Sequence, residues 1–142
     1  MLVKEIMSKN PVTISQEESS AVAARLLSRH NLGSLPVCGS DGRLRGIVTD
    51  RDIVLRCVAA ENDPDITPVR EIMSRSMITV SPEDDVRSAA QLMAGRQVRR
   101  LPVVEKGKVV GVLSLGDMAR SDRFDMECAK VLSEISANVR RR

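Results

Sequence analysis

The chain has 142 residues, enough to bury one sizeable core or two small cores that support each other. Apolar residues make up 42% and charged residues 29%, a balance typical of a folded globular protein, and the absence of Trp and Tyr removes the stacking surfaces that single-stranded nucleic acids need. The net charge of +3 is mild and comes partly from the arginines at 140–142, which we expect to form a solvated tail, so charge gives only weak support to nucleic-acid binding.

The most informative feature of the sequence is an internal repeat. Residues 3–8 (VKEIMS) recur as residues 69–74 (VREIMS), and further matches follow in the same order through the LPV triplets at 35–37 and 101–103. Ordered similarity of this kind indicates a duplicated structural unit. We therefore expect four parts: repeat 1 at 1–60, a polar linker at 61–68, repeat 2 at 69–122, and a C-terminal amphipathic helix with a basic tail at 123–142.

Each repeat begins with a pattern that predicts a strand and a helix. β-branched residues at 12–14 and 78–80 favour a short strand. The helix should begin next, because Ser15 with Glu18 and Ser81 with Asp84 have capping-box spacing, and Pro82 would suit a first helical turn. Its buried stripe would consist of apolar residues at helical spacing, namely Val22, Ala23, Leu26 and Leu27, and in repeat 2 Val86, Ala89, Ala90 and Met93.

A hairpin and a second helix complete each predicted repeat. The hairpin strands are expected at 35–38 with 44–48, and at 101–104 with 109–113, joined by polar turns. Pro36 and Pro102 cannot donate a backbone hydrogen bond, so they should lie at a strand start or a sheet edge. The second helices would open at Thr49 and Ser114.

The last segment of the chain predicts one more helix. One of its faces would carry Phe124, Cys128, Val131, Leu132, Ile135 and Val139. Such a stripe would pack on the rest of the protein or on a second subunit.

The predicted fold class is mixed α/β (α+β), with two short βαββα units. Each unit has too few strands to be stable alone. Packed sheet to sheet with pseudo-twofold symmetry, the two would bury each other's faces and leave two equivalent clefts at the seam.

The repeat resembles the CBS domain, named after cystathionine β-synthase, and the pair resembles a Bateman module. The resemblance rests on Met7 and Met73, on the LPV strands, and on two motifs of a glycine, two aliphatic residues, a hydroxyl residue, two variable residues and an aspartate, at 46–52 and 111–117. The similarity runs from residue 3 to about residue 120 and leaves the C-terminal helix outside.

The resemblance implies a regulatory module that binds an adenosine-containing ligand in the clefts between the repeats. AMP, ADP or ATP would be the first choices, and S-adenosylmethionine or NAD the second. It implies no required cofactor, a homodimer, and an effector protein as the receiver of the signal.

The resemblance also implies the residues that bind the ligand. Asp52 and Asp117 would hold the ribose diol, and Thr49 and Ser114 would lie near the ribose and phosphates. The phosphates would be reached by arginines, namely Arg99, Arg100 and Arg51. The adenine would be bordered by Thr13, Ile14, Pro36, Val37, Thr79, Val80, Pro102 and Val103, with aliphatic side chains as walls.

These roles agree with elementary chemistry. A carboxylate can accept both hydrogen bonds of a cis-diol, and an arginine fork fits phosphate oxygens. The repeats are unequal, because Arg99 and Arg100 stand where repeat 1 has Gly33 and Ser34. The two sites should therefore differ in affinity.

The same residues also have simpler interpretations. The aspartates and hydroxyl residues may be read as ordinary helix caps, and the arginines as solvated surface charge. A ligand-free dimerisation or protein-interaction module is the alternative function, and nucleic-acid binding a weaker one. With no GxSxG motif, no Walker loop and no paired His and Cys, we expect no enzymatic activity.

The remaining signals concern location and metals. Three cysteines without CxxC spacing are typical of buried thiols in a reducing compartment, and His30, the single histidine, leaves no metal site to predict. No apolar run reaches membrane-spanning length and the N-terminus lacks a signal-peptide pattern, so we expect a cytoplasmic protein without membrane contact.

Overall fold

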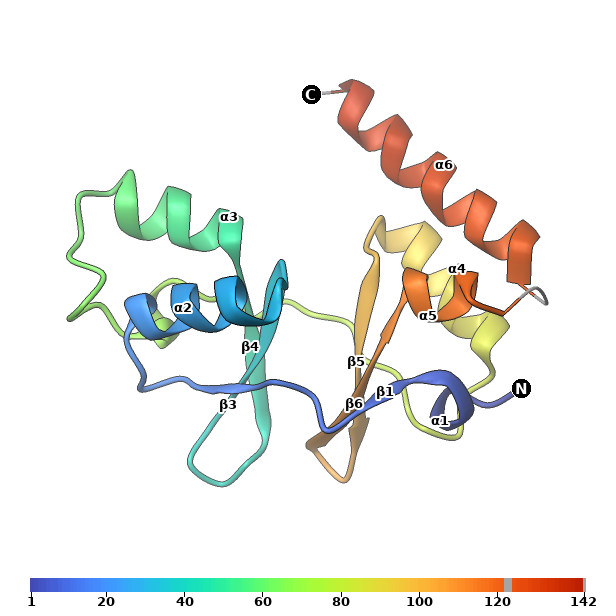
Figure 1. Ribbon diagram of the computed structural model, residues 1–142, viewed down its shortest axis with the longest axis horizontal. Coiled ribbons are helices and arrows are strands. Elements are labelled where there is room, and N and C mark those ends of the chain that lie inside the picture. Colours follow the sequence, from blue (N-terminus) through green and yellow to red (C-terminus); the bar gives the residue numbers. More distant parts are fainter. Residues whose placement is uncertain (122–123, 142) are drawn as a thin grey trace. The chain divides into compact units, whose positions relative to one another are not determined.

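The computed structural model describes residues 1–121 and 124–141, with side chains for 1–121 and 124–137. The chain forms two compact units, one of residues Val12–Met77 and one that combines Met1–Pro11 with Ile78–Arg142. Each unit holds a three-stranded sheet and a hydrophobic core of its own (Figure 1).

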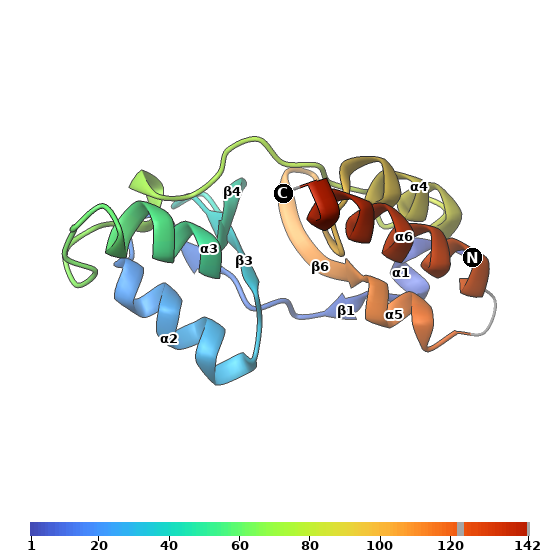
Figure 2. The ribbon, with the colours of Figure 1, turned by 90° about the horizontal axis from the view of Figure 1, so that it is seen from above.

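The unit of residues 12–77 is built around the strand order β2-β3-β4. The central strand β3 (Ser34–Cys38) pairs in parallel with β2 (Ile14–Ser15) and antiparallel with β4 (Leu44–Thr49). The helices of this unit are α2 (Ser20–His30), α3 (Asp50–Asp52) with its continuation as the π-helix η1 (Ile53–Val58), and the 3-10 turn η2 (Val69–Glu71). Figure 2 shows α2 and α3 running along the same side of β3 and β4.

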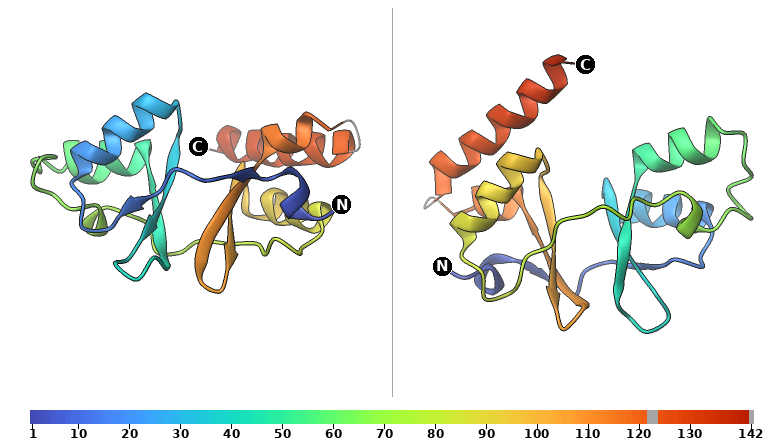
Figure 3. Two further views of the ribbon diagram at one scale, coloured as in Figure 1. Left: turned by 60° about the horizontal axis from the view of Figure 1, so that its bottom comes forward. Right: turned by 180° about the vertical axis from the view of Figure 1, so that it is seen from behind.

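The other unit also combines a hairpin with a third strand, in the order β1-β6-β5, but here the second strand of the hairpin is the central one. The antiparallel hairpin is formed by β5 (Arg100–Glu105) and β6 (Lys108–Ser114), and β1 (Ser8–Lys9) pairs with β6 (Figure 3). The helices are α1 (Val3–Ile6), α4 (Val86–Arg96), α5 (Leu115–Ala119) and α6 (Asp125–Arg141). The mixed α/β class and the order of elements predicted from the sequence are confirmed, with one reduction: residues 78–80 provide only a parallel bridge from Val80 to Val103. The expected packing of the two sheets against each other stays a prediction.

The predicted starts of the first helices are wrong by about one turn. Ser19 caps α2 by accepting a hydrogen bond from Val22 N at 3.2 Å, and Asp85 caps α4. Ser15 and Ser81 instead open tight turns in which each hydroxyl accepts a bond from the backbone two residues on. Local spacing could not distinguish a turn before a helix from the helix itself.

The helix starts are fixed by contacts that are distant in the sequence. Ser20 N donates to Thr67 O at 2.8 Å, and Val86 N donates to Met1 O at 3.0 Å. These carbonyls satisfy donors that the first turn of any helix leaves without an intrahelical partner. The buried stripes then agree with prediction at Ala23, Leu27 and all four positions in α4, whereas Val22 and Leu26 are half-buried.

The two prolines lie where a missing donor is tolerated. Pro102 is on β5, an edge strand, and its carbonyl accepts from Val80 N at 3.1 Å. For Pro36 the expected strand start or sheet edge is wrong, because it is the middle residue of the central strand β3; its missing donor is tolerated since the pairing with β2 begins only at Val37.

The helix α6 lies alongside α4 and α5 in Figures 1 and 2. Phe124, Cys128 and Val131 are buried, and the Arg87 guanidinium lies 5.7 Å from the centre of the Phe124 ring. The predicted apolar stripe is therefore confirmed in its first half, but Leu132 is 51% exposed. The side chain of Val139 lies outside the described residues. Among the helices of the described part of the chain, none has the length and apolarity needed to cross a membrane.

The compact units do not coincide with the sequence repeats. Two leading segments, residues 2–9 and 68–74, are exchanged: the first pairs with the hairpin of repeat 2, and the second with the hairpin of repeat 1. Ile47 N donates to Ser74 O at 2.9 Å and Ser74 N donates to Ile47 O at 2.8 Å. Each unit thus needs residues from both repeats to complete its sheet.

The glycines of the repeated motif make this exchange possible. A Cβ atom built on Gly46 would lie 2.5 Å from Ser74 O, and one built on Gly111 would lie 2.8 Å from Ser8 O and 2.6 Å from Met7 Sδ. These distances are shorter than a carbon atom tolerates, so any side chain here would push the leading segment off the sheet.

We expect Gly46→Ala and Gly111→Ala each to lower the free energy of unfolding by about 1–3 kcal/mol, the typical cost of overpacking. The measurement is urea denaturation followed by far-UV circular dichroism. Gly95→Ala is the matched control, since no atom lies within 4 Å of its added Cβ and the residue is in the helix α4. The control should be neutral or stabilise by up to about 1 kcal/mol, and equal stability of all three variants would contradict the assignment.

Candidate functional site

The predicted ribose-binding residues of repeat 1 form a closed turn at the end of β4. Asp52 N donates to Thr49 Oγ1 at 3.0 Å, and Thr49 N donates to Asp52 Oδ2 at 3.0 Å. This reciprocal pair is a capping box that starts α3. The capping interpretation is therefore correct, and it uses only one oxygen of the carboxylate.

Repeat 2 has the same arrangement at the end of β6. Asp117 N donates to Ser114 Oγ at 3.0 Å, and Ser114 N donates to Asp117 Oδ2 at 2.8 Å. The turn starts α5. The two motifs are alike in sequence, and the turns that they form have the same reciprocal hydrogen bonds between the hydroxyl residue and the aspartate.

The second carboxylate oxygen differs between the two turns. Asp52 Oδ1 accepts no hydrogen bond from any described residue, and its nearest cationic atom is Arg56 Nε at 3.9 Å. Asp117 Oδ1 is bonded by the Arg120 guanidinium and lies 3.5 Å from Ser8 Oγ. The Asp52 side chain is 13% exposed and that of Asp117 is 4% exposed. The carboxylate of repeat 1 is therefore the more available of the two.

The hairpins bring the predicted phosphate-binding residues next to these turns. Arg100 is the cross-strand neighbour of Ser114, and Leu115 N donates to Arg99 O at 2.8 Å. In repeat 1, Ser34 is the neighbour of Thr49, and Asp50 N donates to Gly33 O at 3.1 Å. The two adjacent arginines thus lie beside the turn of repeat 2 only.

Three arginines of the predicted site keep their charge exposed. Arg51, Arg99 and Arg100 are exposed, and none of them forms an ion pair with a side chain of the described residues. Their guanidinium groups are available to an anion.

The predicted adenine-binding residues need a correction. The walls were expected from Ile14, Val37, Val80 and Val103, but these side chains are 0–4% exposed and belong to the two hydrophobic cores. Pro36 and Pro102 are buried as well, whereas Thr13 and Thr79 are exposed. The strands can therefore offer backbone groups and threonine side chains to a ligand, and the aliphatic side chains serve the core instead.

Cys38 borders the same strands in repeat 1. Burial raises the pKa of its thiol, and a hydrogen bond with Thr13 partly opposes that effect. The thiol is therefore neutral near pH 7, so this border of the strand carries no charge.

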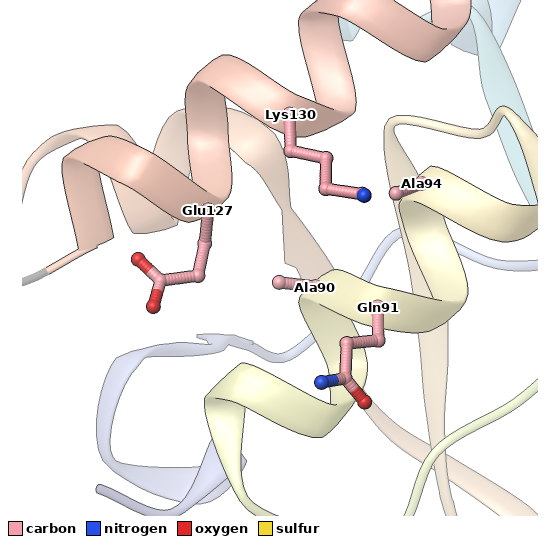
Figure 4. Close-up of a pocket in the computed structure, with 5 residues that line it drawn as sticks. All are labelled: Ala90, Gln91, Ala94, Glu127 and Lys130. Carbon is pink, nitrogen blue, oxygen red and sulfur yellow. The ribbon is translucent and has the colours of Figure 1, made fainter.

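The cavity that the structure shows between α4 and α6 is separate from these residues (Figure 4). Its volume is about 40 Å³, and it is lined by Ala90, Gln91, Ala94, Glu127 and Lys130. It has room for little more than a water molecule and includes none of the predicted site residues. Across the described residues, no cluster of three or more His, Cys, Asp or Glu side chains is arranged to hold a metal ion.

Three contacts around the aspartates were not predicted from the sequence, those of Ser8, Arg56 and Arg120. Arg56 Nη1 donates to the carbonyls of Ile72 and Met73 at 3.3 and 3.2 Å. Ser8 reaches Asp117 only because the leading segments are exchanged. Arg120 stands three residues after its aspartate, a helical spacing that does predict a contact.

The sequence of this chain is similar to a known domain family and to several known proteins. The sequence model described as the CBS domain matches residues 3–58 and 69–123. The chain is 39% identical over 134 residues to the CBS domain-containing protein YhcV of Bacillus subtilis, with 94% of each chain covered. It is 34% identical over 117 residues to Hypoxic response protein 1 of Mycobacterium tuberculosis, with 82% of each chain covered.

Two crystal structures show the same fold. One is Hypoxic Response Protein I with two coordinated zinc ions, at a TM-score of 0.78 and 32% identity, covering 84% of this chain and 98% of that one. The other is the CBS domain pair of protein MJ0100 in complex with 5-methylthioadenosine and S-adenosyl-L-methionine, at a TM-score of 0.74 and 34% identity, covering 84% and 94%.

We expect Thr49→Ala and Ser114→Ala each to lower the free energy of unfolding by about 0.5–2 kcal/mol, because each removes the acceptor of a helix cap. Chemical denaturation measures the loss. Ser88→Ala, at an exposed hydroxyl inside α4, is the control and should change stability little. Cap variants as stable as this control would show that the capping boxes contribute nothing.

Proposed function

Because the chain belongs to the CBS-domain family and carries two copies of the domain, we propose that it is a regulatory module that binds an adenosine-containing ligand and catalyses no reaction. The observation that carries this proposal is the matched pair of turns at Asp52 and Asp117. In each turn the cap needs only one carboxylate oxygen, so the fold of the turn leaves the other as an acceptor for ribose hydroxyls.

The class of ligand follows from what the turns can recognise. Methylthioadenosine and S-adenosylmethionine, which occupy the MJ0100 pair, share adenine and a ribose diol with AMP, ADP and ATP. A carboxylate oxygen accepts hydrogen bonds from the diol of any of them. The two turns therefore support an adenosine-containing ligand as a class, and they do not distinguish one of these ligands from another.

The charge around the turns favours the nucleotides. Arg51, Arg99 and Arg100 are exposed arginines next to the two turns. One guanidinium group can donate two parallel hydrogen bonds to two oxygens of a phosphate. Its positive charge repels the sulfonium cation of S-adenosylmethionine. We accordingly rank AMP, ADP and ATP above S-adenosylmethionine.

We expect AMP, ADP or ATP to raise the melting temperature of the protein by several degrees, because a ligand at about 100 times its Kd stabilises the folded state by about 2.7 kcal/mol. The measurement is a thermal-shift panel that also contains NAD, methylthioadenosine and S-adenosylmethionine, followed by calorimetry. The Asp52→Asn/Asp117→Asn double variant should lose the shift, since an amide keeps a cap acceptor but replaces one carboxylate oxygen with a donor.

Asp50→Asn is the matched control for that panel. It removes a carboxylate from the same turn, at an exposed position outside the capping box. The control should keep the ligand-induced shift. A panel in which no member shifts the melt would contradict the proposal and favour a module that works without a ligand.

A second role, association of two copies of this chain, is favoured by the surface of η1. Val54, Leu55 and Val58 are 55%, 48% and 61% exposed on this short helix. Neighbouring exposed apolar side chains of this kind mark protein contacts more often than isolated ones do. We propose that η1 contributes to a homodimer.

We expect the protein to sediment as a dimer at micromolar concentration and Val58→Glu to shift it toward monomer, because a desolvated charge opposes burial of the patch. Analytical ultracentrifugation measures the change. Ser40→Glu adds the same charge at an exposed position of the β3–β4 turn and should leave the dimer intact. A wild-type monomer, or a Val58→Glu dimer, would refute this role for η1.

A further inference from the structure

We propose that Arg120 is a specificity-determining residue of repeat 2: its guanidinium competes with ribose hydroxyls for Asp117 and makes this site weaker for adenosine than the site of repeat 1. The inference rests on the proposed function, because it assumes that the aspartates bind a diol. It adds a residue outside the repeated motif and a cause for unequal binding.

The contacts of Arg120 define the competition. Asp117 uses Oδ2 for the cap, so Oδ1 is the oxygen left for a ligand. That oxygen is the one bonded by Arg120 Nη2. The Arg120 side chain is 72% exposed while that of Asp117 is 4% exposed, so the arginine covers the carboxylate from the solvent side.

The space above the turn agrees with this position. A Cβ atom built on Gly116 would lie 3.6 Å from Arg120 Nη1 and 3.6 Å from Ser114 Oγ. The guanidinium therefore lies close to Gly116 in the first turn of α5, on the side where it contacts Asp117. It lies where a hydroxyl group donating to Asp117 Oδ1 would have to approach.

Repeat 1 has no such competitor. The position that corresponds to Arg120 is Leu55, and Arg56, the nearest arginine, keeps its Nε atom 3.9 Å from Asp52 Oδ1. Arg56 also donates through Nη1 to the carbonyls of Ile72 and Met73, which hold it away from the aspartate. Asp52 Oδ1 thus has only a long ion pair with Arg56 and accepts no hydrogen bond from the described residues, so a diol would displace less there than at Asp117.

The size of the effect follows from the exposure of the pair. We take the range for exposed ion pairs, about 0.2–1 kcal/mol, because the Arg120 side chain is 72% exposed and water and salt screen its charge. A ligand that must displace it binds more weakly by the corresponding factor, about one and a half- to fivefold. Higher salt should reduce this difference.

The test is isothermal titration calorimetry with adenosine, which is uncharged and so does not depend on the phosphate-binding arginines. The Asp52→Asn background confines diol binding to Asp117. In that background Arg120→Met, which keeps the length of the side chain and removes its donors, should tighten adenosine binding about one and a half- to fivefold at low salt, and less at 0.5 M NaCl. In the Asp117→Asn background the same substitution should leave the affinity unchanged.

Arg96→Met is the matched control, since it removes one exposed arginine from the same unit outside the site. Melting curves of all variants establish that they fold. Unchanged or weaker binding in Asp52→Asn/Arg120→Met, with normal adenosine binding by the wild type, would overturn the role of Arg120 and leave the proposed function standing. Failure of adenosine to bind to the wild type and to every variant would overturn the role of Arg120, and the proposed function falls with it only if AMP, ADP and ATP also fail to bind.

Discussion

The structure depends on a close backbone contact that only glycine permits. Ser74 O passes over Gly46 and Ser8 O passes over Gly111, at distances that leave no room for a side chain. The contact holds each leading segment against the hairpin of the other repeat. The residues immediately before these segments, Met1 and Thr67, supply carbonyls to the first turns of α4 and α2, so the sheet edge and the helix starts are fixed by neighbouring residues. Neither repeat, taken as a continuous stretch of sequence, contains all the residues of one compact unit.

This constraint also shapes the candidate site. The turns at Asp52 and Asp117 follow β4 and β6 directly, and these are the strands with which the leading segments pair. Each turn is therefore attached to a strand that is hydrogen-bonded on both sides, to its hairpin partner and to the leading segment. A reciprocal cap then fixes the aspartate within the turn. A carboxylate positioned in this way needs little ordering when it binds a ligand, which lowers the entropic cost of binding.

The sequence was sufficient to predict the hairpins, the second helices and the caps at Thr49 and Ser114, because those features depend on neighbours within a few residues. It was insufficient where a distant segment decides. The helices α2 and α4 begin at Ser20 and Val86 because the backbone carbonyls of Thr67 and Met1 lie there, and the turns before them resemble capping boxes in sequence. The exchange itself has no local signal, since the two leading segments have nearly the same sequence and fit either hairpin. The sequence also could not show that the aliphatic residues expected at the adenine are buried in the two cores, because a strand pattern does not reveal which face the core covers.

Duplication makes the two aspartates comparable, and the differences between the repeats then acquire meaning. In each turn Oδ2 of the aspartate accepts the hydrogen bond of the cap, so a residue that replaces the aspartate must supply this acceptor. Oδ1 is not needed for the cap, and it can be used for binding. Repeat 1 keeps this second oxygen without a hydrogen bond from the described residues, whereas repeat 2 gives it to Arg120 and places two further arginines beside the turn. The two changes act in opposite directions on a nucleotide, because Arg120 competes for the ribose while Arg99 and Arg100 attract the phosphates. Under the proposed function, a ligand with several phosphates should gain most from repeat 2, and an uncharged nucleoside should gain most from repeat 1. Under the proposed function, divergence of a few side chains on one duplicated scaffold would therefore give the two sites preferences for different parts of the same ligand.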